Sequence, residues 1–403
     1  MTKPELLAPA GSMESLEAAL RFGADAVYLG GRMLQLRASS AAFSLEGIEA
    51  AARKAHAAKK RLYVTVNALA KNGEIAPLKA YANELFDCGA DAAIVSDLGV
   101  LTTMHAACPA LELHVSTQAS CQNYAAANAY HALGAKRIVL AREMTLEEIR
   151  LLRKNTPPSL ELEAFVHGAM CMAVSGRCLL SAAMLGRSGN RGDCAQPCRW
   201  RYHLLEETRP DRLLTIEQEG SAAAILSSRD LNCIDLLAEL SDAGVCSFKI
   251  EGRMKTEYYT AVTVNAYRHA IDGDMPIERL RRELDTVSHR PYTTGFYLGE
   301  LPEDHANRGT YIQDYTFCGT VQSVKDGVAT VEQRNRFLPG DTLEAVSPTH
   351  SGAPVPIPWI TDTDGASVPI ANRVRQIVRI PAPAWLCAGD LLRRKNDESS
   401  HGA

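Results

Sequence analysis

The 403-residue sequence predicts an α/β protein: a (β/α)8 TIM-like barrel with a long insertion between strands 7 and 8, followed by a small C-terminal all-β barrel domain. Across the first 275 residues or so, short apolar runs alternate with helical segments rich in Ala and Leu. The near-continuous apolar character of these runs is typical of parallel strands buried on both faces. After the first run, "PAGSMES" has too few glycines for the dinucleotide fingerprint of an open, doubly wound sheet.

Eight apolar runs supply the predicted barrel strands: 5–9, 26–30, 61–67, 92–97, 112–118, 137–142, 162–168 and 247–253. The segments between them carry helix signals. Ser12 precedes a helical pattern that stops at Gly23, and Thr145 precedes another that has basic residues in its last turn. Eight strand–helix units within about 270 residues are what a (β/α)8 barrel requires.

The regular spacing is interrupted once, between strands 7 and 8. A loop and helix normally need roughly 20 residues, whereas the segment from Ala169 to Val245 is far longer and ends in a predicted helix at 233–244. The insertion, residues 169–232, begins at the carboxyl end of a strand, which is the catalytic face of such barrels. We therefore expect the functional site to lie beside it.

The pattern changes after the eighth unit. "GTVQSV", "VATVEQ" and "RQIVRI" read as short strands, with "PGD" and "AGD" as turns. The predicted boundaries are 1–285 for the barrel, 286–308 for a connector, 309–395 for the small β-domain and 396–403 for a flexible tail.

Composition narrows the class of protein. A net charge of −4 and a pI near 6.3 exclude a wholly basic nucleic-acid coat protein, although a local basic surface is compatible with both values. The first residues, "MTKPELLAPAG", lack the apolar run of a signal peptide, and no stretch approaches the ~18 apolar residues of a membrane span. We expect a cytoplasmic protein with no membrane partner.

Cysteines cluster in the insertion. Cys171, Cys178, Cys194 and Cys198 fall within 28 positions, and Cys233 follows just before a predicted helix. A reducing compartment disfavours disulfides, and the spacing differs from the paired CxxC of zinc ribbons. Iron–sulfur centres accept sets of four cysteines at varied spacings. Buried thiols and a zinc site remain open alternatives, and the density of cysteines on a catalytic face favours an iron–sulfur cluster.

Four segments together resemble one known family: "ELLAPAGSMESLEAALRFGADAVYLGG", "FVHGAMCMAVSGRCLLS", "RGDCAQPCRW" and "SFKIEGRMKTEYYTAVTVNAYRHAID". The chain is similar, over essentially its whole length, to the U32 "peptidase" or collagenase-like family. Within that family it most resembles tRNA hydroxylation proteins that make 5-hydroxyuridine at the wobble position, uridine 34. Sister groups hydroxylate a 23S rRNA cytidine, or the ubiquinone ring without oxygen.

This resemblance implies a cofactor, a reaction and partners. The ubiquinone relatives carry a 4Fe–4S cluster, and their pattern selects Cys171, Cys178, Cys194 and Cys233 here, with Cys198 as the alternative fourth ligand. The implied reaction is oxygen-independent hydroxylation of tRNA with prephenate, a small anionic co-substrate, as the hydroxyl source. A related partner subunit is a further implied partner. Competing functions are a U32-type peptidase, a 23S rRNA cytidine or ubiquinone-ring hydroxylase, and a noncatalytic RNA-binding protein.

The protease name has little support in motifs. The sequence contains neither an HExxH zinc helix nor a GxSxG nucleophile elbow. His167 and Cys171 form a Cys/His pair on paper, because the seventh strand ends beside the cysteine loop. A cysteine that binds a cluster is not free to attack a peptide bond, so proteolysis ranks second.

Basic and aromatic residues of the insertion suggest RNA contact. Between positions 177 and 201 the sequence contains one acidic residue, Asp193, and five arginines: Arg177, Arg187, Arg191, Arg199 and Arg201. A local positive patch is what docking on a phosphate backbone requires, and Trp200 and Tyr202 beside it suit stacking on an unpaired base. The alternative is a solvated charged loop with an aromatic anchor.

The eighth strand ends in charged residues. Lys249, Glu251 and Arg253 stand at i, i+2 and i+4, so that all three point the same way, into the barrel or its mouth. They form either a structural ion-pair network or an anion site. The family resemblance implies that Arg253, Lys249 and Arg142 bind the carboxylates of prephenate. Glu251, which can orient the nucleotide or shuttle a proton, and His167, by its position at a strand end, are the catalytic candidates. Three other strand-end residues qualify by position alone: Asn67, Asp97 and Gln118.

Overall fold

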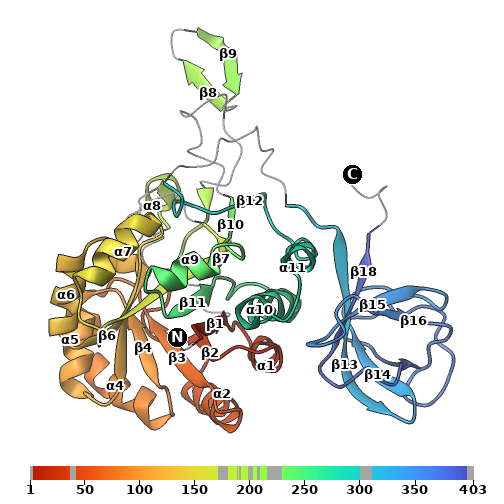
Figure 1. The fold of residues 1–403 in the computed structure, drawn as a ribbon. Coiled ribbons are helices and arrows are strands. Elements are labelled where there is room, and N and C mark those ends of the chain that lie inside the picture. Colours follow the sequence, from red (N-terminus) through yellow and green to blue (C-terminus); the bar gives the residue numbers. More distant parts are fainter. Residues whose placement is uncertain are drawn as a thin grey trace.

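A computed structural model describes residues 3–36, 42–170, 180–187, 189, 192–197, 203–206, 209–215, 229–299 and 311–396. Eight parallel strands form a closed ring in the order β11-β1-β2-β3-β4-β5-β6-β7, and β7 pairs with β11 to close it. The strands are β1 (Glu5–Pro9), β2 (Ala26–Gly30), β3 (Arg61–Val66), β4 (Ala92–Val95), β5 (Glu112–Val115), β6 (Ala135–Val139), β7 (Glu161–Ala169) and β11 (Ser247–Ile250). This confirms the predicted (β/α)8 barrel (Figure 1).

Helices follow the strands and cover the outside of the ring (Figure 1). They are α1 (Met13–Arg21), α2 (Leu45–Ala57), α3 (Asn72–Ile75), α4 (Leu78–Asp87), α5 (Leu98–Ala107), α6 (Tyr124–Ala132), α7 (Leu146–Lys154), α9 (Leu237–Asp242), α10 (Glu257–Asp272) and α11 (Ile277–Leu284). The predicted caps are present: Ser12 accepts a hydrogen bond from the Ser15 amide, and Thr145 forms a capping box with Glu148. The helix expected at 233–244 is shorter, because α9 begins at Leu237.

The strand that leads into the insertion extends beyond the ring. The end of β7 pairs antiparallel with β10 (Asp230–Asn232), which in turn pairs with β12 (Tyr292–Thr293). The insertion also contains α8 (Leu180–Leu185) and an antiparallel hairpin of β8 (His203–Glu206) and β9 (Arg209–Thr215).

The C-terminal sheet is antiparallel, as predicted, and has the order β16-β15-β18-β13-β14-β17. Its strands are β13 (Tyr315–Lys325), β14 (Val328–Gln333), β15 (Thr342–Val346), β16 (Pro354–Pro356), β17 (Ile377–Pro381) and β18 (Leu391–Lys395). It has its own apolar core, which includes Val331, Phe337 and Val378. Arg393, 2% exposed, bonds Glu283 of α11 at 2.9 Å and so ties the sheet to the barrel.

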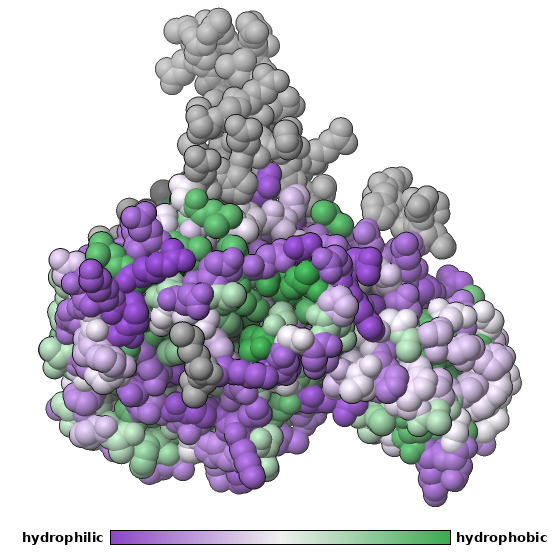
Figure 2. Space-filling view, viewed as in Figure 1, coloured by the Kyte–Doolittle hydropathy of each residue, from purple (hydrophilic) through white to green (hydrophobic). Residues whose placement is uncertain are grey.

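Most of the apolar core lies between the ring and its helices, and a small second cluster fills part of the ring itself, from Leu7 and Ala26 to Tyr63 and Ile94. Hydrophilic residues cover much of the face seen in Figure 2. Across the described ranges, every helix is too short or too polar to cross a membrane.

Candidate active site at the carboxyl end of the barrel

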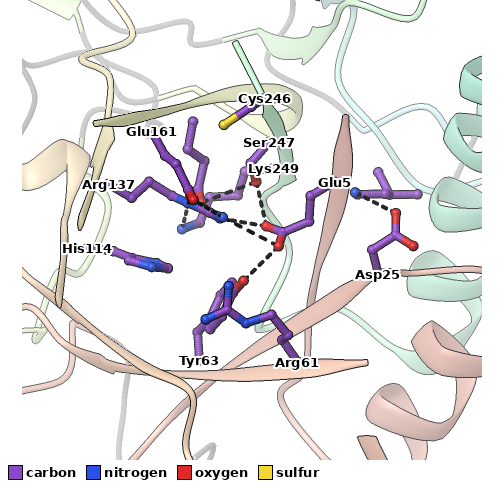
Figure 3. A network of polar contacts seen from close by, with 12 residues as sticks. Glu5, Asp25, Arg61, Tyr63, His114, Arg137, Glu161, Cys246, Ser247 and Lys249 are labelled. Atoms are coloured by element: carbon purple, nitrogen blue, oxygen red, sulfur yellow. Dashed lines mark hydrogen bonds and ion pairs between the residues drawn. The ribbon is translucent and has the colours of Figure 1, made fainter. Parts of the chain in front are cut away.

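The lower part of the barrel interior holds a group of paired charges, here called the base network: Glu5, Tyr63, Arg137, Glu163 and Lys249. The Arg137 guanidinium lies 2.6 Å from the Glu5 carboxylate and 3.0 Å from that of Glu163. Tyr63 donates a hydrogen bond to Glu5 at 2.7 Å. Figure 3 shows Arg137, Tyr63 and Ser247 converging on Glu5 from different strands. Each charged group of the base network thus has an oppositely charged partner.

Lys249 belongs to this network. Its ammonium lies 2.8 Å from the fully buried Glu163 carboxylate and 4.5 Å from the centre of the Tyr28 ring. Burial alone would raise the pKa of Glu163, but Lys249 and Arg137 lower it to about 2. Of the two roles predicted for Lys249, ion pair or anion clamp, this geometry favours the ion pair.

Arg142 and Glu251 meet above the base network, at the carboxyl end of the ring. The Arg142 guanidinium lies 3.4 Å from the Glu251 carboxylate, stacks 4.0 Å from the centre of the Phe165 ring, and donates to the Ala169 carbonyl at 2.7 Å. Both side chains are mostly buried, at 13% and 15% exposure. The Arg142 Nε is buried and finds no hydrogen-bond partner within the described ranges. A fixed guanidinium with one unused donor suits an anionic ligand.

Arg253 reaches the same end of the barrel from beyond β11. Its Nη1 donates to the Thr65 hydroxyl on β3 at 2.8 Å, and the residue is 6% exposed. It lies over Gly30, the last residue of β2. A Cβ at Gly30 would stand 2.6 Å from the Arg253 Nη1 and 2.1 Å from the Gln35 Oε1, so any larger residue would displace one of these two groups.

Two carboxamides complete the site. Asn67 follows β3 and donates to the Ser116 hydroxyl at 3.3 Å. Gln35 lies beside it, because the Leu34 carbonyl accepts from the Ala68 amide at 2.6 Å. The Asn67 Oδ1 and the Gln35 Oε1 are buried and without a hydrogen-bond partner in the part of the chain that the structure describes. Buried unpartnered acceptors are rare and indicate a missing donor. We call the six residues at this end the mouth cluster: Gln35, Thr65, Asn67, Arg142, Glu251 and Arg253.

His167 does not join the mouth cluster. The register of β7 against β11 shifts at Lys249 and Ile250, so His167 pairs with the outward-facing Ile250. The imidazole consequently lies among tyrosine rings, with the Tyr267 centroid at 5.4 Å and the Tyr259 centroid at 5.9 Å, both on α10. Burial lowers its pKa to about 3. The seventh strand does end beside the site, but this side chain faces the helix layer.

The insertion lies against the mouth cluster. A Cβ at Gly192 would stand 2.6 Å from the Gln35 carbonyl oxygen, so the two backbones are in contact. Cys194 follows two residues later, within about 7 Å of chain reach. Its Sγ accepts a hydrogen bond from the Gln196 amide at 3.3 Å. Arg187 pairs with Asp193 at 2.9 Å, and both side chains are more than half exposed.

Cys233 lies lower, beside β7. Its amide donates to the Val166 carbonyl at 2.9 Å, its Sγ is 3.9 Å from the Thr294 carbonyl oxygen, and the residue is fully buried. Burial raises the pKa of this thiol well above its ordinary value. The other predicted ligands and arginines lie outside the described residues: Cys171, Cys178, Cys198, Arg177, Arg191, Arg199 and Arg201.

Two of the predicted cluster ligands can therefore be compared with what a cluster needs. Within the described ranges no three His, Cys, Asp or Glu side chains form a metal site. Cys194 and Cys233 are free thiols, and the Gln196 amide already points at the Cys194 sulfur, as amides do around iron-bound thiolates. The donor chemistry of Cys194 fits an iron–sulfur cluster, whereas the buried Cys233 thiol, with its raised pKa, lies against Tyr267 and Thr294.

Some members of the mouth cluster escaped the sequence-based search. Asn67 is among the strand-end candidates, and Thr65 continues the same inward alternation from Arg61 and Tyr63, so the period-two pattern alone could have found Thr65 as well. Gln35 carries no such signal. It reaches the mouth through a loop, and only Gly30, which leaves room for it, marks the place.

Comparison with known proteins places the chain among relatives of several names. A model described as "Peptidase family U32" matches residues 11–307, and one described as "Peptidase family U32 C-terminal domain" matches residues 313–393. "tRNA hydroxylation protein P1" of Bacillus subtilis is 35% identical over 407 residues, covering 97% of this chain and 95% of the relative. "23S rRNA 5-hydroxycytidine C2501 synthase" of Escherichia coli is 38% identical over 269 residues, 67% of this chain and 39% of the relative. A "Collagenase" of Porphyromonas gingivalis is 33% identical, covering 86% and 87%.

Proposed function

The chain belongs to peptidase family U32, and from that premise we propose that it is an RNA hydroxylase that forms 5-hydroxyuridine at the wobble position of tRNA. The observation that carries the proposal is the mouth cluster, where two guanidiniums and two carboxamides meet at the catalytic face of the barrel. Relatives named for RNA hydroxylation cover 97% and 67% of the chain. The protein acts in the cytoplasm, where its substrate is found.

Two arginines suit a dicarboxylate co-substrate. Arg142 and Arg253 approach the mouth from different strands, and each holds its guanidinium in place through a second contact, with Ala169 or Thr65. A pair of fixed guanidiniums binds two carboxylates with defined geometry. Prephenate, a dicarboxylate, is the proposed hydroxyl donor, and no molecular oxygen is required.

Glu251 is the proposed general base, the group that accepts a proton from the substrate. Hydroxylation at C5 of uracil replaces a hydrogen by a hydroxyl group, which removes one proton and two electrons from the C5–H bond. A carboxylate near the uracil accepts the proton, and the co-substrate that gives up its hydroxyl group is the two-electron acceptor and takes up a proton in its place. Glu251 lies at the mouth, 15% exposed, with its carboxylate 3.4 Å from the Arg142 guanidinium. His167 is a weaker candidate, since its imidazole faces α10 and its pKa is about 3.

Cys171, Cys178, Cys194 and Cys233 are the proposed ligands of a 4Fe–4S cluster, with Cys198 as the alternative to Cys233. When bound, such a cluster supplies electron-transfer chemistry at the mouth. The arginines of the insertion, Arg187, Arg191 and Arg199, then contact RNA phosphates beside it.

Nucleoside mass spectrometry tests the function. A strain that lacks this gene and any paralogue should lose 5-hydroxyuridine-derived nucleosides from its tRNA. The wild-type chain should restore them, whereas Cys194→Ala and Glu251→Gln should not. If the tRNA of the deletion strain is unchanged and a 23S rRNA cytidine has lost its modification instead, the substrate is 23S rRNA and not tRNA.

The fourth ligand is tested by metal content. Cys233→Ala and Cys198→Ala proteins, purified without oxygen, are assayed for iron, sulfide and the visible absorbance of the cluster. Exposed Cys387, far from the insertion in sequence, supplies the control Cys387→Ala. Loss of cluster in Cys233→Ala alone supports the first assignment, and loss in Cys198→Ala alone supports the second. A colourless zinc protein would contradict the cluster proposal.

A peptidase is the competing function, and the placement of His167 counts against it. A Cys/His protease needs an imidazole that can take a proton from the thiol near neutral pH. An imidazole with a pKa of about 3, enclosed by Tyr259 and Tyr267, is a poor base for that purpose. If the protein still cleaves casein after its metal has been removed, a peptidase becomes the favoured function.

A further inference from the structure

A groove of about 370 Å³ opens in the C-terminal sheet, far in sequence from the mouth cluster. It is lined by residues 333–336, at and just beyond the end of β14, and by Asn372, Val374 and Arg375, which precede β17. We call it the C-terminal groove. Three of the lining residues are arginines and two are asparagines, so its walls consist mainly of hydrogen-bond donors.

Two of the arginines are held by carboxylates. Arg334 bonds Glu257 at 2.6 Å, and Arg375 bonds Glu332 at 2.6 Å and Glu14 at 3.0 Å. These pairs fix both guanidiniums, and each guanidinium has five N–H donors, more than its contacts use. Arg336 is different. It is exposed and carries no ion pair within the described part of the chain, so among the groove arginines it is the one whose guanidinium is left to contact an anionic ligand.

The ion pairs also place the C-terminal groove. Glu14 is in the first turn of α1 and Glu257 in the first turn of α10. These helices follow β1 and β11, so their first turns lie at the carboxyl face of the barrel. The groove therefore opens beside the face that carries the mouth cluster. A linear polymer that places its reacting unit in the mouth cluster can extend over the first turns of α1 and α10 toward Arg336.

We propose that the C-terminal groove binds the phosphodiester backbone of the substrate RNA, with Arg336 as its principal phosphate contact. The inference rests on the proposed function, which makes the substrate an RNA. Guanidinium groups match phosphate geometry, and asparagine side chains add donors to phosphate or ribose oxygens. Val374, 94% exposed at the rim, offers apolar contact to a sugar or a base. The groove positions the RNA and takes no part in the chemistry.

Arg336→Ala tests this without disturbing the fold, because the side chain is exposed and has no ion pair to break in the described structure. Affinity for an unmodified tRNA transcript is measured by fluorescence anisotropy from about 50 to 300 mM salt. Loss of one phosphate contact should reduce the slope of log K against log[salt] by about 0.7–0.9 and weaken binding about fourfold near 0.15 M. Arg336→Glu should weaken binding further. In hydroxylation assays KM for tRNA should rise while kcat stays unchanged.

The matched control is Lys325→Ala. Lys325 is also exposed and carries the same charge, but it is on β13 and pairs with Val328 at the opposite end of β14, a strand about 17 Å long. Wild-type affinity and salt slope in Arg336→Ala, or an equal loss in Lys325→Ala, would overturn the proposal. Arg336-dependent tRNA binding without hydroxylation would instead leave the groove in place and reject the proposed function. If Arg375→Ala lowers the melting temperature but leaves tRNA binding unchanged, Arg375 only connects the C-terminal sheet to the barrel and does not contact the RNA.

Discussion

The two ends of the barrel interior differ in how their charged residues are paired. In the base network, every charge has an oppositely charged partner: Arg137 lies between Glu5 and Glu163, and Lys249 bonds Glu163. In the mouth cluster, the Arg142 Nε, the Asn67 Oδ1 and the Gln35 Oε1 are buried without hydrogen-bond partners in the described structure. The base network is built from strand residues that point inward, whereas most of the mouth cluster comes from residues that follow the ends of strands.

The difference separates stability from function. Buried charges are tolerated when they are paired, so the base network is a structural solution to charges inside a barrel. Buried polar atoms without partners cost free energy, and a protein that keeps them has a use for them. In barrels of this kind the carboxyl end carries the chemistry and the amino end supports the fold. Substitutions at the two ends should therefore affect different measurements.

The largest effect on stability is expected in the base network. Glu163→Ala leaves Lys249 and one side of Arg137 without their buried carboxylate, which should lower the free energy of unfolding by about 3–5 kcal/mol. Urea denaturation measures this. The isosteric Glu163→Gln keeps the shape and should cost less. If the Glu163→Ala protein unfolds at the wild-type urea concentration, the base network is not a structural element.

A smaller effect, of a different kind, is expected at the mouth. Arg253→Ala should lower kcat/KM for tRNA hydroxylation about 100-fold, because a guanidinium that positions the co-substrate is lost, while the urea midpoint changes little. Arg253→Lys should recover only part of the activity, since an ammonium lacks the bidentate geometry. Steady-state kinetics with varied prephenate provides the test, and full activity in Arg253→Ala would remove this residue from the site.

Asn67→Leu should change activity and stability in opposite directions. The apolar isostere removes a buried acceptor that has no partner in the described structure, so stability should rise by about 1 kcal/mol. Hydroxylation should fall about tenfold, because the ligand loses its hydrogen bond. Thermal melts and kinetics on one protein sample measure both. A loss of stability would mean that Asn67 is structural after all.

A further expected effect is the pH dependence of stability. The folded-state pKa of His167, about 3, lies below the ordinary value of 6.5, so its contribution is complete above pH 6.5 and is lost as pH falls toward 3. The pKa of Glu163, about 2, lies below 4.5, so its contribution is lost between pH 4.5 and 2. His167→Gln should flatten the first part of the profile and Glu163→Gln the second. Parallel profiles in all three proteins would contradict both assignments.

The sequence by itself determined the architecture. Alternating apolar runs and capped helical segments predict eight strand–helix units, and every predicted run contains or overlaps a barrel strand. These signals are local: a strand's apolar character and a cap such as Ser12 depend on a few neighbouring residues. The same locality located the carboxyl ends of the strands, and with them Arg142, Glu251 and Arg253 at the mouth.

Only the tertiary structure decided how those residues are used. One register shift between β7 and β11 turns His167 toward α10, and closure of the ring brings Glu163 to Lys249. Gln35 lies in a loop, and its side chain and that of Arg253 both lie over Gly30. The C-terminal groove is lined by the end of β14 and by the segment before β17. Such contacts join residues distant in sequence, and their geometry follows from strand register and ring closure. No short-range pattern records either of these.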